Sequence, residues 1–437
     1  MSDSYNNIIT KIADRKIKIG VLGLGYVGLP LAVTFALKNI KVLGFEKSTE
    51  KARLVNTGEN YIGDIEDEDL VTVVKNGFLE ATDDFTRISE CDAVLICVPT
   101  PLDRFKKPDM RFIESACTEI GQNMRAGTFV CLESTTYPTT TEDLMLPIIE
   151  KESGMKVEDD FWLAFSPERV DPGNEEYKTG NTPKVLGAMT EKGKRIGMDL
   201  YSIAIKHMYP VSSPRVAEMV KILENTYRLV NISLINELAL LSGKMKINIW
   251  EVIEAAKTKP YGFQAFYPGP GVGGHCIPLD PFYLEYIAKK FNFDLTMINT
   301  AGHLDNLMPH RMTIKISTAL NKQKKPINGS KILFLGVAYK PDISDERESP
   351  ALKIMDEVVK KGGDVLYHDP HISVVNTEGG NTFNSVELTD NILEEVDCIV
   401  VTTKHKVFDF EKIGKKAKLI VDLQNAYPSR TDNRYKL

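Results

Sequence analysis

The chain has 437 residues, more than one hydrophobic core usually supports, so two or three domains are expected. Its hydrophobic content of 43% and charged content of 26% are typical of a globular protein, and the net charge of −6 argues against nucleic-acid binding. The polar segment Met1–Arg15 lacks the apolar core of a signal peptide, and no apolar run approaches the length of a membrane span, so neither secretion nor membrane insertion is expected.

The six cysteines form no CxxC pair and no short secreted framework. This pattern favours free thiols in a reducing cytoplasm and gives no reason to expect zinc or another metal. We therefore expect a cytoplasmic protein without a metal site.

Lys16–Leu22 predicts a buried strand that runs into the turn Gly23-x-Gly25-x-x-Gly28 and then into a helix. A second predicted strand ends at Glu46, 21 residues after Gly25, where a carboxylate would bind the ribose hydroxyls of an adenine dinucleotide. The glycines let the pyrophosphate approach the backbone, and the helix N-terminus supplies N–H groups and partial positive charge. NAD is favoured over NADP because Glu46 would repel a 2′-phosphate. A glycine-rich turn without a ligand is the alternative.

Three further apolar runs are typical of parallel strands, and each ends in a polar cluster. Ligands of open α/β sheets bind beyond the carboxyl ends of the strands, so these clusters indicate one crevice. Thr135, Glu168 and Arg169 are the candidate side chains there, although a turn or helix-capping role explains each of them equally well. The runs are Asp92–Val98, Thr128–Leu132 and Trp162–Phe165.

Arg215–Met245 predicts one long helix, because apolar residues recur at spacings of three and four along it. A solvated charged face is the default explanation for its polar residues, but Asn225 has poor helix propensity and argues for a function. Such a helix would bridge two domains and could pair with a second copy of the chain. The polar face comprises Glu218, Lys221, Asn225 and Arg228. The apolar stripe comprises Val216, Val220, Leu223, Tyr227, Val230, Leu234, Leu238 and Leu241.

The segment Pro268–Asp280 places four glycines and two prolines before a single cysteine, Cys276. A loop this rich in glycine is costly to order, so a compensating contact is expected. A thiolate is a strong nucleophile, and the carboxylate of Asp280 follows four residues later. A turn with an incidental buried cysteine explains the segment about as well.

After a predicted linker, Lys324–Ser330, four strands separated by helices predict a second α/β unit. Its first turn carries Lys340 and Arg347, which indicate a phosphate-bearing ligand unless they pair with neighbouring carboxylates. The expected fold is α/β, with two Rossmann-like parallel-sheet domains joined by a central helical region with one long helix. The expected domains are residues 1–211, 212–323 and 324–437.

Six ordered motifs span nearly the whole chain: Gly20–Pro30, Val98–Pro101, Glu133–Thr135, Ala217–Asn225, Gly271–Asp280 and Gly336–Pro350. Together they resemble the UDP-glucose/GDP-mannose dehydrogenase family. The resemblance implies an N-terminal NAD-binding domain, a central helical dimerisation region with the cysteine loop, and a C-terminal domain that binds a UDP-sugar. It also implies a homodimer or a larger homo-oligomer formed through the central helix.

The resemblance assigns roles to individual residues, with Cys276 at the position of the family nucleophile. Catalytic roles are implied for Cys276, Lys221, Asn225, Asp280, Glu168 and Thr135. NAD contacts are implied for Gly23, Gly25, Tyr26, Val27, Gly28, Glu46, Pro99, Thr100, Thr135 and Arg347. Substrate contacts are implied for Glu168, Arg169, Val170, Lys221, Asn225, Tyr267, Gly273 and Lys340.

Within that family the chain looks most like the UDP-N-acetylglucosamine 6-dehydrogenases, which implies the synthesis of surface polysaccharide precursors. Three segments carry this closer resemblance: Ser166–Asn174, Gly262–Gly269 and Cys276–Asp280. One departure is Thr139, because a glycine usually follows the proline at that point. The sequence leaves open UDP-GalNAc, UDP-ManNAc and UDP-glucose, sugars that a few side chains can discriminate.

The implied reaction is a four-electron oxidation of a primary alcohol to an acid, through a thiohemiacetal and a thioester on Cys276. A two-electron oxidation needs no nucleophile, whereas reaching the acid without releasing aldehyde does. The sequence does not decide whether Asp280 or Glu168 activates the hydrolytic water. Two other classes stay open: a two-electron hydroxyacid or sugar dehydrogenase, and a non-catalytic dinucleotide-binding module.

Overall fold

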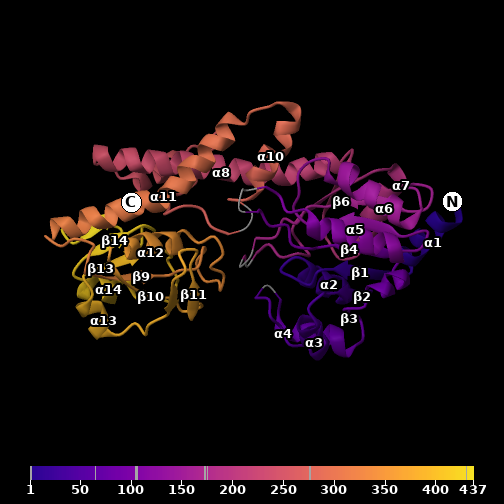
Figure 1. The fold of residues 1–437 in the computed structure, drawn as a ribbon, viewed down its shortest axis with the longest axis horizontal. Helices are drawn as coiled ribbons and strands as arrows, with labels where there is room; N and C mark the ends of the chain where they lie inside the picture. The colour runs from indigo at the N-terminus through magenta and orange to yellow at the C-terminus, as the bar shows by residue number, and fades with distance from the viewer. Residues whose placement is uncertain are drawn as a thin grey trace. The chain divides into compact units, whose positions relative to one another are not determined.

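The computed structural model describes residues 2–63, 65–103, 107–171, 174, 176–274, 277–429 and 431–437. The chain forms two compact units, residues 1–224 with 282–293, and residues 225–281 with 294–437; their elements are labelled in Figure 1. One boundary between the units falls between Glu224 and Asn225, inside the long central helix. The division into three domains, at 211/212 and 323/324, stays a prediction. None of the described helices is both long enough and apolar enough to cross a membrane.

The first unit is built on an eight-stranded sheet in the order β3-β2-β1-β4-β5-β6-β7-β8. Strands β1 to β6 are parallel, whereas β7 pairs antiparallel with β6. The strand order reverses between β1 and β4, the position at which doubly wound sheets bind ligands. The strands are β1 Lys18–Leu22, β2 Lys41–Phe45, β3 Leu79–Thr82, β4 Ala93–Ile96, β5 Phe129–Leu132, β6 Trp162–Phe165, β7 Lys184–Ala188 and β8 Met208–Pro210.

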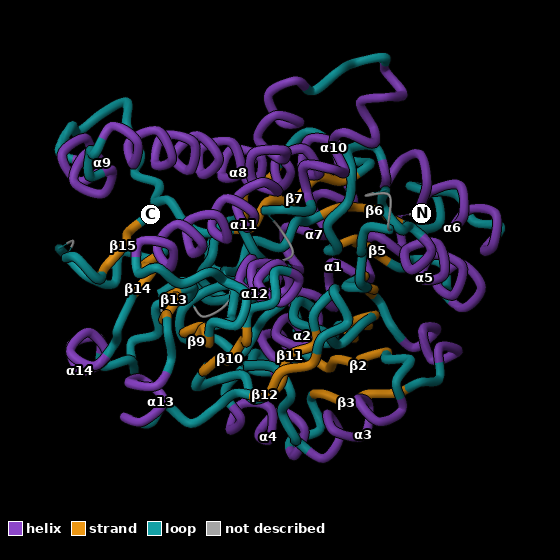
Figure 2. Tube along the Cα trace, turned by 60° about the vertical axis from the view of Figure 1, so that its left-hand side comes forward, coloured by secondary structure: helices purple, strands orange, loops and turns teal. Residues whose placement is uncertain are grey.

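Helices cover both faces of this sheet, so its inner strands are buried on both sides (Figure 2). Alternate residues of one strand enter different cores: Ile19 and Val21 pack on the side of α2 and α7, and Leu22 packs on the side of α5 and α6. The helices are α1 Ser2–Ala13, α2 Gly28–Ala36, α3 Thr49–Thr57, α4 Asp67–Lys75, the 3₁₀ helix η1 Phe85–Glu90, α5 Arg111–Asn123, the π-helical turn η2 Thr141–Met145, α6 Leu146–Ser153 and α7 Glu191–Tyr201.

The second unit contains a five-stranded parallel sheet, β10-β9-β13-β14-β15, and a two-stranded hairpin. One face packs on α11 and α12, and the other on α13 and α14. Its strands are β9 Lys331–Leu335, β10 Asp364–His368, β11 Val374–Asn376, β12 Thr382–Asn384, β13 Cys398–Val401, β14 Ile420–Asp422 and β15 Arg434–Lys436. Its helices are α9 Ile249–Lys257, α11 Thr296–Lys322, α12 Pro350–Lys360, α13 Asp390–Glu395 and α14 Phe410–Lys416. Helix α10, Asp280–Ala288, starts in this unit and ends in the first, where η3, Lys289–Phe291, follows.

The α/β class and the two parallel sheets are confirmed, whereas the sequence analysis missed the shortest edge strands, the antiparallel strand β7 and the hairpin β11–β12. Strands β3, β8 and β15 have three or four residues each, too few to show a period of two. The antiparallel β7 follows a long polar segment, which concealed its start at Lys184.

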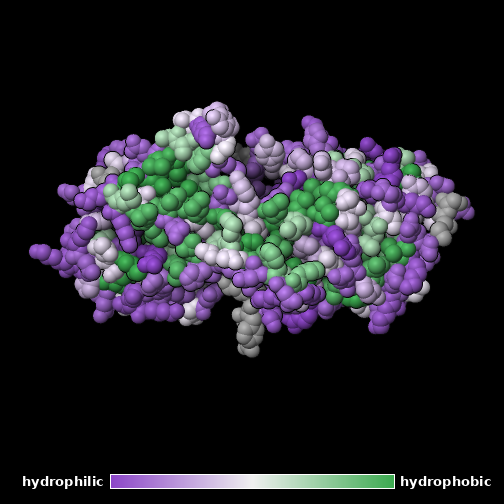
Figure 3. Space-filling view, turned by 90° about the horizontal axis from the view of Figure 1, so that it is seen from above, coloured by the Kyte–Doolittle hydropathy of each residue, from purple (hydrophilic) through white to green (hydrophobic). Residues whose placement is uncertain are grey.

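The long helix α8, Pro214–Met245, begins one residue before the predicted Arg215 and ends at the predicted Met245, and it buries polar residues for which exposure to solvent was the default explanation. A solvated polar face is the wrong explanation for Glu218, Lys221 and Asn225, which are at most 7% exposed; of the four, only Arg228 lies in solvent. Figure 3 shows apolar side chains, in green, exposed on the side of the molecule where α8 lies. Eight apolar residues of α8 form one stripe and are each 38–61% exposed: Val216, Met219, Leu223, Tyr227, Leu234, Leu238, Leu241 and Met245.

Glu218 satisfies a strained turn at the start of η2. Thr139 there has φ of +85°, a left-handed conformation that is unfavourable for a β-branched residue. The Thr139 N–H donates to Glu218 Oε2 at 2.6 Å, and the Thr141 N–H and hydroxyl donate to Oε1 at 2.9 and 2.7 Å. Burial raises the pKa of Glu218 despite these bonds. Thr139 therefore adopts a backbone conformation that favours glycine, the residue that is usual at this position in the family that the sequence resembles.

Replacing Thr139 by glycine should stabilise the protein. The change removes the left-handed strain and a buried hydroxyl that has no partner among the described residues, and these gains exceed the added backbone entropy by about 1 kcal/mol. Thermal and urea unfolding of Thr139→Gly measure the effect. Thr140→Gly is the matched control, because Thr140 has an ordinary φ of −58° and should lose stability. A melting temperature for Thr139→Gly at or below that of the wild type would contradict the strain.

Candidate active site

The glycine-rich turn after β1 has the geometry of a dinucleotide cradle. A Cβ on Gly28 would lie 1.9 Å from the Gly23 carbonyl oxygen, and one on Gly23, which has φ of +89°, would lie 2.7 Å from the Cys97 carbonyl oxygen. Gly25, in contrast, has open space where a side chain would be. Two glycines thus close the turn and the third leaves its backbone accessible at the start of α2, which fits the pyrophosphate of NAD.

Glu46 lies at the carboxyl end of β2, beside this turn. Its Oε2 accepts from the Leu24 N–H at 3.2 Å, and its Oε1 accepts from the Ser48 N–H at 3.1 Å. These bonds hold the carboxylate where the ribose of a dinucleotide would lie. Tyr26, at 46% exposed, and Val27 form the rim of the same turn.

The turns after β4 and β5 are joined to one another through Ser134, and the turn after β4 is also joined to α10 through Tyr283. The Ser134 hydroxyl donates to the Val98 carbonyl at 2.7 Å, and the Thr100 carbonyl accepts from the Tyr283 hydroxyl. Thr135 is half-buried next to Ser134, and Pro99 is exposed next to Thr100. Parallel pairing of β4 with β5 brings these predicted cofactor residues to one edge of the sheet.

The loop after β6 brings Glu168 and Arg169 to the polar face of α8. Lys221 Nζ donates to the Glu168 carbonyl oxygen at 2.6 Å, while Glu168 Oε1 accepts from the N–H groups of Arg169 and Val170 at 2.8 and 2.6 Å. The Arg169 guanidinium binds Glu224 through two hydrogen bonds, at 2.6 and 3.3 Å. Within the first unit, four of the predicted substrate residues therefore form one connected group.

In the second unit, Asn225 and Asp280 lie in direct contact. Asn225 Nδ2 donates to Asp280 Oδ2 at 2.5 Å, and the two residues are 6% and 2% exposed. Asp280 is the first residue of α10, where the helix dipole favours a negative charge. His275 and Cys276 lie outside the described residues, so the predicted nucleophile has no structural account.

The glycine loop before Cys276 is packed against protein. Its backbone is held by Asn236, which accepts from the Gly269 N–H at 2.9 Å, and by Asp305, which accepts from the Val272 N–H at 2.8 Å. A Cβ on Gly273 would lie 2.6 Å from Tyr339 Cβ, and one on Gly274 would lie 2.9 Å from the Tyr339 ring. These contacts are of the kind expected to offset the conformational entropy that a glycine-rich loop loses when it is ordered.

Lys340 follows Tyr339 in the first turn of the second sheet. The turn lies after β9, between β10 and β13 in the sheet, where the strand order reverses and a nucleotide would bind. Arg347 is paired with Asp345, through bonds of 2.8 and 2.6 Å, so the carboxylate partner considered from the sequence is present. Tyr267 stacks on Trp250 with ring centroids 5.7 Å apart, and its hydroxyl donates to Glu254 at 2.7 Å.

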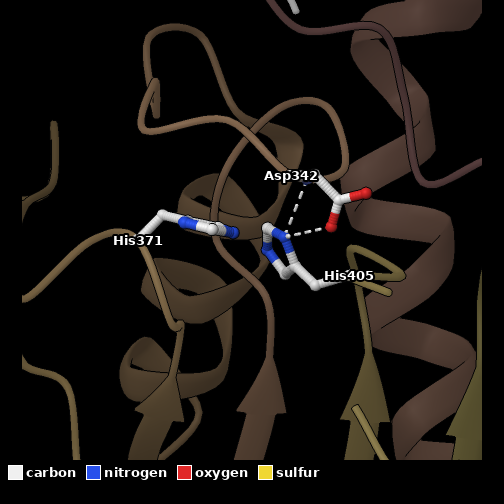
Figure 4. Close-up of side chains that lie close together, drawn as sticks. All are labelled: Asp342, His371 and His405. Carbon is white, nitrogen blue, oxygen red and sulfur yellow. Dashed lines mark hydrogen bonds and ion pairs between the residues drawn. The ribbon is translucent and has the colours of Figure 1, made fainter. Parts of the chain in front are cut away.

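A group of three possible metal ligands stands next to the Lys340 turn: Asp342, His371 and His405 (Figure 4). His405 Nδ1 accepts from the Asp342 N–H at 2.9 Å, so Nε2 carries the proton and donates to Asp369 Oδ2 at 3.1 Å. Burial alone would raise the pKa of Asp369, but hydrogen bonds from His405 and from backbone N–H groups lower it to about 2. Both nitrogens of His405 are thus occupied within the protein, and the cluster is explained as an anchor of the turn.

One buried group escaped the sequence analysis. Lys184 Nζ lies 2.5 Å from Glu133 Oε2 and 3.3 Å from the Pro167 carbonyl oxygen, beneath the loops that carry Thr135 and Glu168. The available signal was a lone lysine opening the apolar run Val185–Ala188, a position that normally holds a hydrophobic residue.

Comparisons with known proteins agree with this description. Three successive segments match models of one family: residues 17–205 match the NAD-binding domain of the UDP-glucose/GDP-mannose dehydrogenase family, 215–306 its central domain and 333–429 its UDP-binding domain. The chain is 35% identical over 414 residues to UDP-N-acetyl-D-mannosamine dehydrogenase of Pyrococcus horikoshii, covering 93% of this chain and 95% of that protein. It is 31% identical over 421 residues to UDP-N-acetyl-D-glucosamine 6-dehydrogenase of Salmonella typhi, covering 95% and 97%.

The fold is also that of a solved relative. The structure of the UDP-D-ManNAc dehydrogenase from Pyrococcus horikoshii superimposes with a TM-score of 0.88 at 33% identity, covering 96% of this chain and 99% of that one. NAD as the cofactor and oxidoreductase chemistry follow from the matched domains. The chain belongs to the UDP-glucose/GDP-mannose dehydrogenase family.

Proposed function

We propose that the protein oxidises a UDP-N-acetylhexosamine at C6 to the uronic acid, with two equivalents of NAD⁺. The observation that carries the proposal is the buried polar face of α8, where Lys221 and Asn225 stand one helical turn apart. UDP-GlcNAc is the substrate expected from the sequence, and UDP-ManNAc is a second candidate because a relative at 35% identity carries that name.

Lys221 and Asn225 stabilise negative charge that develops on the C6 oxygen. An ammonium and an amide NH₂ each donate more than one hydrogen bond, so both are the type of group that can bind a sugar oxygen beside a protein partner such as Glu168 or Asp280. In a buried site such fixed donors are usually the largest electrostatic contribution to catalysis. Bound NAD⁺ supplies the hydride acceptor for both oxidations.

Cys276 keeps the intermediate on the protein. After the first oxidation its thiolate attacks the C6 aldehyde to give a thiohemiacetal, and loss of a second hydride gives a thioester. Water then cleaves the carbon–sulfur bond and restores the thiol. Asp280 and Glu168 are the two carboxylates proposed to orient that water. The five described cysteines are buried thiols, which agrees with a cytoplasmic setting for the reaction.

The first test is the stoichiometry of NADH formed to UDP-sugar consumed. UDP-GlcNAc, UDP-ManNAc, UDP-GalNAc and UDP-glucose are assayed in parallel, with the sugar product identified by mass spectrometry. We expect two NADH and one uronate per acetylated UDP-sugar. One NADH per substrate would indicate the two-electron alternative, and no turnover across the panel would favour the non-catalytic one.

Replacing Cys276 by serine should lower uronate formation at least about 1,000-fold, because a serine hydroxyl is not ionised at neutral pH and does not form the covalent adduct. Uronate and NADH are measured together. Cys117→Ser is the matched control, since Cys117 lies in α5, where a serine hydroxyl can bond to its own helix. Unchanged uronate production by Cys276→Ser would remove the thiol from the mechanism.

We further propose that the exposed apolar stripe of α8 pairs with a second copy of the chain. Eight apolar side chains in one row are unusual for a monomer in water, and a row along a helix suits the same row on a partner helix.

Leu234→Glu should convert the dimer to a monomer, because it places a charge in the middle of the stripe. Light scattering coupled to gel filtration measures the mass. Val374→Glu makes the same type of change at a residue 47% exposed on the β11–β12 hairpin and should leave the mass unchanged. A wild-type mass of one chain at micromolar concentration would overturn the pairing.

A further inference from the structure

A buried ion pair lies at the edge of the first sheet where β5 and β6 end. Lys184 Nζ donates to Glu133 Oε2 at 2.5 Å, and the Tyr201 hydroxyl donates to the other oxygen of this carboxylate. Glu133 and Tyr201 are 0% exposed and Lys184 is 6% exposed. Lysine and glutamate are almost never buried so completely unless they are paired.

The stability of the fold does not account for this pair. The desolvation of two charges often exceeds their attraction, and uncharged residues of similar volume frequently hold a fold as well. Burial disfavours the ammonium of Lys184, but the charges of Glu133 and Glu168 outweigh it and raise the pKa of Lys184. Burial and neighbouring groups raise the pKa of Tyr201, so its hydroxyl remains a donor. What the charged pair adds is directed hydrogen bonding.

One of those bonds reaches the loop that carries Glu168. Lys184 Nζ lies 3.3 Å from the carbonyl oxygen of Pro167, and the next carbonyl along the chain, that of Glu168, accepts from Lys221. Lys184 contacts the loop whose Glu168 carbonyl accepts from Lys221, so the position of the Lys221 ammonium depends on Lys184.

Two more bonds hold this loop against the start of β7. The Ser166 hydroxyl donates to the Val185 carbonyl at 2.7 Å, and the Arg169 guanidinium donates to the Pro183 carbonyl at 2.7 Å. With Lys184 between them, three consecutive residues of the β7 segment bind the loop.

The carboxylate end of the pair fixes a second loop. Glu133 is the first residue after β5, its N–H donates to the Ile96 carbonyl at 2.9 Å, and Thr135 follows two residues later. The pair thus spans the two loops in which Thr135 and Glu168 stand, and fixes one loop relative to the other.

We propose that Glu133, Lys184 and Tyr201 form a positioning network for catalysis, which sets the loop of Glu168 and through it the ammonium of Lys221. This inference rests on the proposed function. The three residues do not touch the substrate, and their effect is on kcat through geometry, since a displacement of about 1 Å can cost roughly 100-fold in rate.

The test separates positioning from stability. Lys184→Met leaves a buried unpaired carboxylate and should lower the melting temperature by about 10 °C. Glu133→Gln/Lys184→Met is uncharged, keeps an acceptor for Tyr201, and should melt within about 3 °C of the wild type. We expect the double variant to lose roughly 10- to 100-fold in kcat, with KM and Kd for NAD⁺ within about twofold of wild type. Tyr201→Phe keeps both charges and, should the double variant not fold, tests the network through a roughly threefold to tenfold loss in kcat.

Arg125→Met is the matched control, because its ion pair lies at the amino end of β4, whereas Glu133 and Lys184 lie where β5 and β6 end. Arg125 pairs with Asp92, which is 7% exposed and directly precedes β4. Its loss should lower stability and leave kcat unchanged.

Hydrogen exchange of the peptide covering residues 160–171 gives a readout that is independent of turnover. Faster exchange in the double variant, with the reduced kcat, supports the network. Wild-type kcat and wild-type exchange in a folded double variant would overturn it. If the wild type oxidises no UDP-sugar, the proposed function fails, and the exchange of residues 160–171 alone decides whether the pair fixes the loop.

Discussion

The polar face of α8 contributes buried, hydrogen-bonded side chains to each of the two units. A buried polar group is tolerated only when it is hydrogen-bonded, so Glu218, Lys221 and Asn225 each require a partner at a fixed place. Those partners are an N–H of the turn before η2, a carbonyl of the loop after β6 and the carboxylate of the first residue of α10. In each unit, α8 contributes the buried polar side chain, and a turn, a loop or a helix start contributes its hydrogen-bond partner.

This arrangement also explains why the apolar side of α8 is left in solvent. The side of α8 that packs on its own chain carries these polar residues beside buried apolar ones such as Ile222 and Leu229, and the second apolar row lies on the other side. Asn236 continues that face further along, where it accepts from the Gly269 N–H, and Ser233 donates to the Ala301 carbonyl. The exposed stripe then remains for a partner, because hydrophobic side chains in a row gain free energy only when another apolar surface covers them.

The sequence alone predicted those features of the fold and site that depend on a local pattern of residues. Continuous apolar runs predicted the inner strands, and the spacing from Gly25 to Glu46 predicted the turn and carboxylate that the structure brings together. The period of α8 predicted a helix but not which side is buried, since a period is the same for either side. Glu133 and Lys184 are 51 positions apart, and the residues around either one do not indicate that the two side chains are in contact.

The two glycine-rich segments look alike in sequence but meet different physical requirements. In the turn after β1, Gly25 faces open space, so the absence of a side chain leaves the backbone accessible to a ligand. In the loop before Cys276, Gly273 and Gly274 lie where a Cβ would collide with Tyr339, so the absence of side chains lets the loop close on the protein. Tyr339 directly precedes Lys340, the residue expected to bind the UDP-sugar. The turn expected to bind the substrate and the described part of the loop before Cys276 therefore lie on neighbouring residues of one segment, Tyr339 and Lys340.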